Sequence, residues 1–255
     1  MCRLFGLIAN KEVDIKFSIL EAKNHFKKQG KNNPHGWGIG YYKNSEPKVE
    51  KYGESAFDSN KFDELVKEIK SKIFIAHVRY ASSGSPHCDR NAHPFVYKNW
   101  IFAHNGTIDK ERTLKLLIPP YNQNFTSEPI DSEVYFRFLI QCIEKGNDVS
   151  KGVCSVAKEV TKNATGANFV LSDGRILCAF RYGKDLYYLR REPASLTMTS
   201  KETQALIGSK TLLKEKAFLI STEKLTENES WKEIENGRLL IIDENLHIRE
   251  VTICQ

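Results

Sequence analysis

From Asn168 onward the chain is built of short apolar runs separated by turn residues, and this texture limits its fold more than any other feature. The runs include NFVLSDG, RILCAFRYG, KDLYYLRR, ASLTM, KAFLIST and GRLLIID, with Gly, Asp, Asn or Lys at their borders. Such runs predict successive short strands, here a late β-meander. Before Asn168, helical and strand patterns are mixed without a regular alternation of strand and helix. We therefore predict an α+β protein rather than a doubly wound sheet.

The first part of the chain offers several further elements. Apolar runs predict strands at 2–9, 37–42, 73–79 and 100–104, and alternation predicts one at 46–52. Helical spacing predicts helices at 14–28, 60–70, 107–117, 131–145 and 149–162. Asn105-Gly106 is a strong turn signal, and Asp131 or Ser132 is placed to cap the helix that follows it.

Composition and charge exclude several classes of protein. The 255 residues are 40% hydrophobic and 27% charged, as in ordinary globular domains, and we expect one domain over residues 1–255. The net charge of +6 is dispersed, so we expect no nucleic-acid partner. No apolar run reaches the ~18 residues of a membrane span, and MCRLFGLIAN is unlike a signal peptide. We expect a cytoplasmic protein with no membrane contact, whose six cysteines are mostly free thiols.

Cys2 can supply both a nucleophile and a base. If Met1 is removed, the chain begins with a free α-amine beside a thiol. An α-amine has an ordinary pKa of ~7.7–8.0, so it can accept the proton of the thiol near neutral pH. A cysteine at this position is also compatible with simple packing at the start of a buried strand.

Four other segments carry side chains that could form a site. Asn105 and Gly106 follow an apolar strand and offer either a hairpin turn or an amide and a backbone N–H for an oxyanion. Arg79 ends another apolar strand, where it could pair with a structural carboxylate or clamp a substrate carboxylate. His93 lies in a loop, and Asp131 stands at a helix start. We expect no metal and no cofactor.

Together these segments resemble one family. The ordered set MCRLFG, NPHGWGIGYY, HVRYASSG, NAHPF, FAHNGTI and DSE is similar to the class II glutamine amidotransferase domain of the N-terminal nucleophile hydrolases. NFVLSDG and the stretch from FLISTEKL to GRLLIID look like the stand-alone branch of that family. The resemblance implies a four-layer αββα sandwich of two antiparallel sheets.

The resemblance also implies the catalytic groups. Cys2 would be the nucleophile, with its own α-amine as the base. The side chain of Asn105 and the backbone N–H of Gly106 would hold the oxyanion of the tetrahedral intermediate.

The substrate-binding groups follow from the same resemblance. Arg79 would bind the α-carboxylate of glutamine, and Asp131 would bind its α-ammonium group. His93 and His104 would shape the site. Tyr80 stands where the sugar-phosphate members of the family have Trp.

Three functions remain open at this point. The first is hydrolysis of the side-chain amide of glutamine to glutamate and ammonia, with a separate synthase subunit as the ammonia acceptor. The second is hydrolysis of γ-glutamyl amides of peptides or thiol metabolites. The third is a catalytically silent regulatory or binding subunit, which a retained Met1 would favour.

Overall fold

Two antiparallel sheets form the centre of the computed structural model, which describes residues 2–82, 84–125, 128–192 and 216–253. In one sheet the strand order is β11 (Lys232–Glu233), β9 (Tyr187–Arg191), β10 (Ala217–Ser221), β1 (Arg3–Val13), β4 (Ser71–Val78), β2 (Trp37–Lys43), β3 (Glu46–Tyr52). In the other it is β13 (Ile248–Thr252), β12 (Arg238–Ile242), β8 (Leu177–Phe180), β7 (Gly166–Ser172), β6 (Trp100–Thr107), β5 (Phe95–Tyr97).

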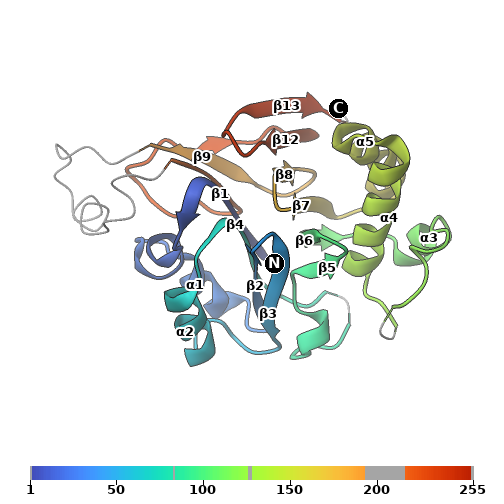
Figure 1. Ribbon diagram of the computed structural model, residues 1–255. Coiled ribbons are helices and arrows are strands. Elements are labelled where there is room, and N and C mark those ends of the chain that lie inside the picture. The colour runs from blue at the N-terminus through green and yellow to red at the C-terminus, as the bar shows by residue number, and fades with distance from the viewer. Residues whose placement is uncertain (1, 83, 126–127, 193–215, 254–255) are drawn as a thin grey trace.

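Helices cover the outer face of each sheet (Figure 1). Beside the β1 sheet lie the π-helical turn η1 (Phe17–Glu21), α1 (Phe26–Gln29), the 3₁₀ turn η2 (Gly30–Asn32) and α2 (Asn60–Glu68). Beside the β6 sheet lie α3 (Lys110–Leu114), α4 (Asp131–Gly146), α5 (Val149–Val160) and the 3₁₀ turn η4 (Thr161–Asn163). A further 3₁₀ turn, η3, spans Asp89–Asn91. The αββα sandwich predicted from the resemblance is confirmed.

Strand β1 is buried on both faces, which explains its nearly continuous apolar sequence. Leu4 and Ile8 belong to the cluster between the two sheets. Phe5 and Leu7 belong to the cluster between the β1 sheet and its helices. Gly6 also faces the other sheet, since a Cβ added there would lie 2.8 Å from Val170. The two sheets therefore pack closely where β1 crosses β7.

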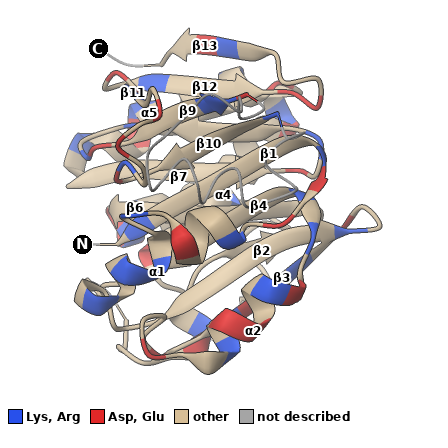
Figure 2. Ribbon diagram, turned by 90° about the vertical axis from the view of Figure 1, so that its left-hand side faces the viewer, with Lys and Arg blue, Asp and Glu red and all other residues tan. Residues whose placement is uncertain are grey.

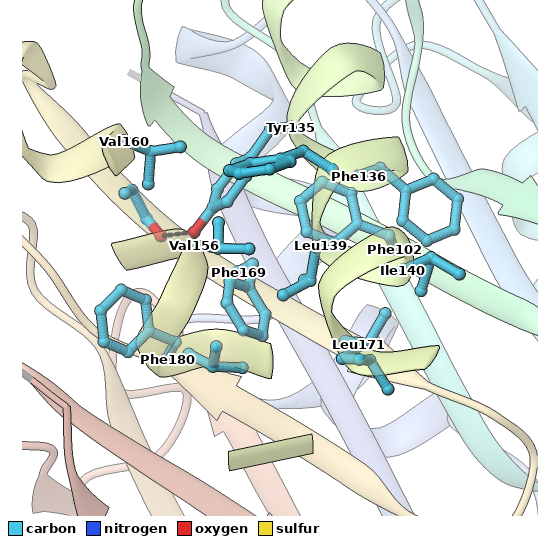
Figure 3. Packing of buried hydrophobic residues seen from close by; sticks show 14 of the residues in the cluster. Phe102, Tyr135, Phe136, Leu139, Ile140, Val156, Val160, Phe169, Leu171 and Phe180 are labelled. Atoms are coloured by element: carbon cyan, nitrogen blue, oxygen red, sulfur yellow. Dashed lines mark hydrogen bonds between the residues drawn. The ribbon is translucent and has the colours of Figure 1, made fainter. Parts of the chain in front are cut away.

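The third cluster lies between the β6 sheet and its helices (Figure 3). The helical spacing of α4 places Tyr135 and Phe136 against the sheet. The rings of Phe102 and Phe136 are stacked, with centroids 5.0 Å apart and an angle of 4° between their planes. The Tyr135 hydroxyl donates a 3.2 Å hydrogen bond to the Ala167 carbonyl. This packing fixes α4 against β6 and β7.

The helix predicted over 14–28 is wrong in extent. The chain forms η1 and then α1, with extended backbone at Ala22 and His25 between them. Tertiary contacts replace the helical bonds there: the Asn24 N–H donates to the Leu225 carbonyl at 3.1 Å, and its side chain donates to Glu223 at 3.2 Å. A distant segment thus overrides the local helical pattern.

The late strands are confirmed as strands, but they do not form one meander. β7, β8, β12 and β13 join one sheet, whereas β9, β10 and β11 join the other. The strand predicted at ASLTM lies outside the described residues. The alternation of the chain between sheets has no signature in the local sequence.

On the face seen in Figure 2, Lys and Arg are interspersed with Asp and Glu. No helix in the described ranges is long and apolar enough to cross a membrane. The five cysteines within those ranges are free thiols, as predicted.

We expect Phe102→Ala to lower the free energy of unfolding by about 3–5 kcal/mol, because it leaves a cavity against Phe136. Val96→Ala in the same hairpin is the control: Val96 is 42% exposed, and its truncation is expected to change stability by about 0.5 kcal/mol or less. Urea unfolding of both variants measures the difference. Equal effects would contradict the packing described for this cluster.

Candidate active site

Cys2 lies immediately before β1 and is half-buried. Its Sγ accepts a hydrogen bond from the Tyr80 N–H at 3.3 Å and lies 3.4 Å from the Tyr80 carbonyl oxygen. Burial raises the pKa of the Cys2 thiol, and the Tyr80 peptide and the charge of Arg79 only partly oppose this. The thiol is therefore protonated at neutral pH and needs a base to become a nucleophile.

The start of β1 is also held by Thr222 and Glu223 of the FLISTEKL segment, a contact that the sequence did not indicate. Arg3 Nε lies 2.5 Å from Glu223 Oε1, and Arg3 Nη1 donates to the Cys2 carbonyl at 3.3 Å. The Leu4 N–H donates to Thr222 Oγ1 at 2.8 Å. Glu223 thus braces the peptide of the candidate nucleophile. The two partners are 220 positions apart, so no local pattern could have indicated the pair.

Arg79 continues the line of β4 beyond its last residue. Its N–H donates to the Gly36 carbonyl at 2.8 Å, and its carbonyl accepts from the His35 N–H at 3.0 Å. The side chain is 3% exposed, and Nη1 donates to the Ser85 carbonyl at 3.0 Å. The charge of Arg79 acts on both Cys2 and Asp131, so the guanidinium lies in their neighbourhood.

Asn105 and Gly106 do not form the predicted turn, because β6 continues through them to Thr107 and pairs with β7. Asn105 is 2% exposed, and its Nδ2 has no hydrogen-bond partner among the described residues. A buried amide N–H without a partner is rare and costly in native proteins, so it calls for a specific explanation.

Gly106 has a close approach to the neighbouring strand. Its φ is +152°, a conformation that L side chains rarely adopt, and a Cβ would lie 1.7 Å from the Gly166 carbonyl oxygen. Only glycine fits here. The Asn-Gly pair that resembles a turn signal is therefore explained by strand packing.

Asp131 is the first residue of α4 and does not cap it, which corrects the capping prediction. The N-cap is Ile130, without a side-chain cap, and Ser132 instead contacts His104. Asp131 Oδ2 accepts from the Ile108 N–H at 3.2 Å, just beyond β6. The carboxylate borders a cavity of about 340 Å³ that Thr107 and Ile108 also line. It thus stands between α4 and the end of β6.

His104, His93 and His77 form a buried group behind these residues. His104 Nδ1 lies 2.9 Å from Ser132 Oγ, which ties β6 to the first turn of α4. The rings of His77 and His93 are 4.2 Å apart. Burial is the main cause that lowers the pKa of all three, to about 3 for His77. They are neutral at physiological pH, and His77 was missed because it lies inside an apolar strand run.

Lys51 of β3 holds the segment that contains His93. Its Nζ donates to the Arg90 carbonyl at 3.0 Å and to the Ala92 carbonyl at 2.8 Å, and lies 4.5 Å from the ring centroid of Phe95. Burial lowers the pKa of Lys51 to about 8. In the sequence it belongs to an ordinary alternating strand, and nothing there distinguishes it.

The sequence-predicted residues therefore converge from separate elements. Cys2 and Arg79 meet at the ends of β1 and β4, and Asp131 acts electrostatically on both. β6, which carries Asn105 and Gly106, contacts β1 across the sandwich. In the described ranges, no three His, Cys, Asp or Glu side chains are grouped to hold a metal ion.

Comparison with known proteins shows the family to which the chain belongs. The family model described as glutamine amidotransferases class-II matches residues 1–252. An uncharacterized protein of Methanocaldococcus jannaschii is 33% identical over 258 residues, which cover 94% of this chain and 69% of that protein. YafJ of Escherichia coli is 31% identical over 268 residues, covering 96% of this chain and all of YafJ.

A solved structure shares the fold. The glutamine aminotransferase class-II domain protein of Silicibacter pomeroyi superposes with a TM-score of 0.65 at 17% identity, covering 98% of this chain and 99% of that one. The chain belongs to the class II glutamine amidotransferase family. This family implies an amidohydrolase or transferase activity.

We expect Gly106→Ala to destabilise the protein by at least about 1–3 kcal/mol, from the backbone conformation alone, with a further loss from overlap with Gly166. Gly146→Ala is the matched control, since a Cβ there lies 3.5 Å from its nearest neighbour, Lys151. We expect that change at the end of α4 to be neutral or to stabilise by up to about 1 kcal/mol. Thermal unfolding compares the two, and a tolerated Gly106→Ala would contradict the strand packing.

Proposed function

We propose that the chain hydrolyses the side-chain amide of glutamine through Cys2 and releases glutamate and ammonia. The observation that carries the proposal is the buried Nδ2 of Asn105, which has no hydrogen-bond partner among the described residues and lies on a strand that contacts β1. Such a donor makes no hydrogen bond to the described residues and is suited to an oxyanion that forms only during the reaction. The backbone N–H of Gly106 is the second donor.

The chemistry begins with removal of Met1, which frees the α-amine of Cys2. This amine takes the thiol proton, and Sγ adds to the amide carbon while the carbonyl oxygen becomes an oxyanion. The α-ammonium group of Cys2 then gives this proton to the leaving nitrogen. The C–N bond breaks, ammonia departs, and a thioester between Cys2 and the glutamyl group remains. Water attacks the thioester, the C–S bond breaks, and glutamate leaves with the thiol restored.

The glutamate half of the substrate is held by two opposite charges. Arg79 binds the α-carboxylate with its planar fork, and Asp131 binds the α-ammonium group at the cavity that it borders. His104 supports Asp131 through Ser132, and His93 packs behind the pocket. We place these functions in one domain over 1–255, in the cytoplasm, with a separate synthase subunit as the acceptor of ammonia.

A second candidate keeps the same groups and changes the leaving amine. Tyr80, whose peptide contacts Cys2 Sγ, is 48% exposed. An open side next to the thiol favours larger γ-glutamyl amides over glutamine alone.

A retained Met1 would instead block the amine of Cys2 and leave a silent binding subunit. The intact mass of the purified protein shows whether Met1 is retained.

Cys2→Ala is expected to abolish release of ammonia from glutamine and to cost at most about 1–2 kcal/mol of stability, because it removes one half-buried thiol. Ammonia assays and urea unfolding measure the two effects. Cys88→Ala, a second half-buried free thiol, is the control and should keep full activity. Turnover at the wild-type rate in Cys2→Ala would reject the mechanism.

Asn105→Ala is expected to lower kcat by about 10²–10³ with little change in KM, because the amide donates to charge that exists only in the transition state. Asn105→Gly separates this role from a backbone role, since glycine keeps every backbone conformation open. Steady-state kinetics on glutamine measure both variants. Near-normal turnover in a stably folded Asn105→Gly protein would reject the oxyanion role.

A further inference from the structure

We propose that the rings of Tyr80, His35 and His87 form a binding surface for the leaving group of a γ-glutamyl amide, and that it favours amines carrying a flat aromatic ring. These three side chains are called the ring surface below. The inference rests on the proposed function of Cys2 and specifies the substrate class of that site.

The ring surface begins at the nucleophile. Both the N–H and the carbonyl oxygen of Tyr80 lie within 3.4 Å of Cys2 Sγ. The Tyr80 side chain therefore leaves the backbone next to the atom that would attack the substrate. Any group bonded to the scissile carbonyl has this side chain as a neighbour.

Arg79 and Tyr80 direct the two ends of a substrate to opposite sides. The chain at Arg79 is still paired with His35 and Gly36, so successive side chains alternate between faces there. Arg79 is buried and faces Ser85, whereas Tyr80 is 48% exposed. The glutamyl arm and the leaving nitrogen diverge from the same carbonyl carbon. With the arm held at Arg79, we therefore place the leaving group on the side of Tyr80.

The rings of Tyr80, His35 and His87 are held by contacts with one another and with the backbone. The His35 ring lies 4.9 Å from the Tyr80 ring, and the His87 ring meets the His35 ring edge-on at 5.3 Å. His35 Nδ1 accepts from the Ala81 N–H at 3.0 Å, and His87 Nδ1 lies 3.1 Å from the Gly53 carbonyl oxygen. Both imidazoles are therefore oriented by the backbone.

The chemistry of the ring surface suits an uncharged flat group. Desolvation and the neighbouring His87 and Arg79 lower the pKa of His35, which favours its neutral form. Aromatic rings at such separations stabilise one another beyond the area that they bury. An added ring on Tyr80 is worth about 2- to 10-fold in kcat/KM on this basis.

The test compares two amides of similar size. The γ-glutamyl amides of 2-phenylethylamine and 2-cyclohexylethylamine differ in whether the leaving group is flat. We expect wild-type protein to prefer the phenyl substrate about 2- to 10-fold in kcat/KM. Tyr80→Leu should reduce this preference by the same factor, whereas Tyr80→Phe should keep it. Comparing each variant with wild type cancels the different basicities of the two amines.

The controls separate this inference from the function on which it rests. Tyr121→Leu removes a ring packed near Lys98 and Glu144 and should keep the wild-type preference. Should Cys2→Ala still hydrolyse the amides, the proposed function itself fails. Two other results would overturn the ring surface and leave the proposed function standing. In the first, hydrolysis depends on Cys2 but Tyr80→Leu keeps the wild-type preference. In the second, hydrolysis depends on Cys2 and glutamine is cleaved, but neither amide is.

Discussion

The site depends on the burial of β1 inside the four-layer sandwich, between the other sheet and the helices that cover its own sheet. This strand is paired with β4 on one side and β10 on the other, and apolar layers cover both of its faces. A strand held in this way cannot slip by one residue, because every side chain would then change faces. Cys2, directly before it, is therefore fixed without being part of a rigid element itself. The brace from Glu223 to Arg3 completes this fixation where the β10 ladder ends.

Burial has opposite effects on the groups around Cys2. It keeps the thiol protonated and the three histidines neutral, so it removes charges that water would otherwise stabilise. It also removes the Asn105 amide from bulk solvent, so any hydrogen bond that the amide makes to a developing negative charge is strengthened. Such a site has few charges in the resting state, and its hydrogen bonds strengthen only where negative charge develops. This suits the proposed oxyanion.

The sequence allowed most strands to be predicted, because they follow from apolar runs. The site residues were named only through a resemblance carried by motifs in a fixed order, and their roles stay predictions. Prediction from the sequence failed where distant contacts decide the local structure. Asn105-Gly106 resembles a turn, yet pairing with Asn168 and Ala167 keeps it in a strand. The 14–28 segment has helical spacing, yet contacts with residues 223 and 225 interrupt it. The pairing of Glu223 with Arg3 has no local signal, since the two residues are 220 positions apart.

The two ends of the proposed substrate meet very different surroundings, and this asymmetry has a physical origin. Arg79 and Asp131 are almost fully buried and opposite in charge, so in the proposed pocket they suit the two charges of the glutamate half. Tyr80 and His87 lie at the surface, where a change of side chain alters neither the sandwich nor the charge pair. Selectivity for the amine can thus change independently of the hydrolytic groups, because the strand alternation at Arg79 and Tyr80 separates the two tasks.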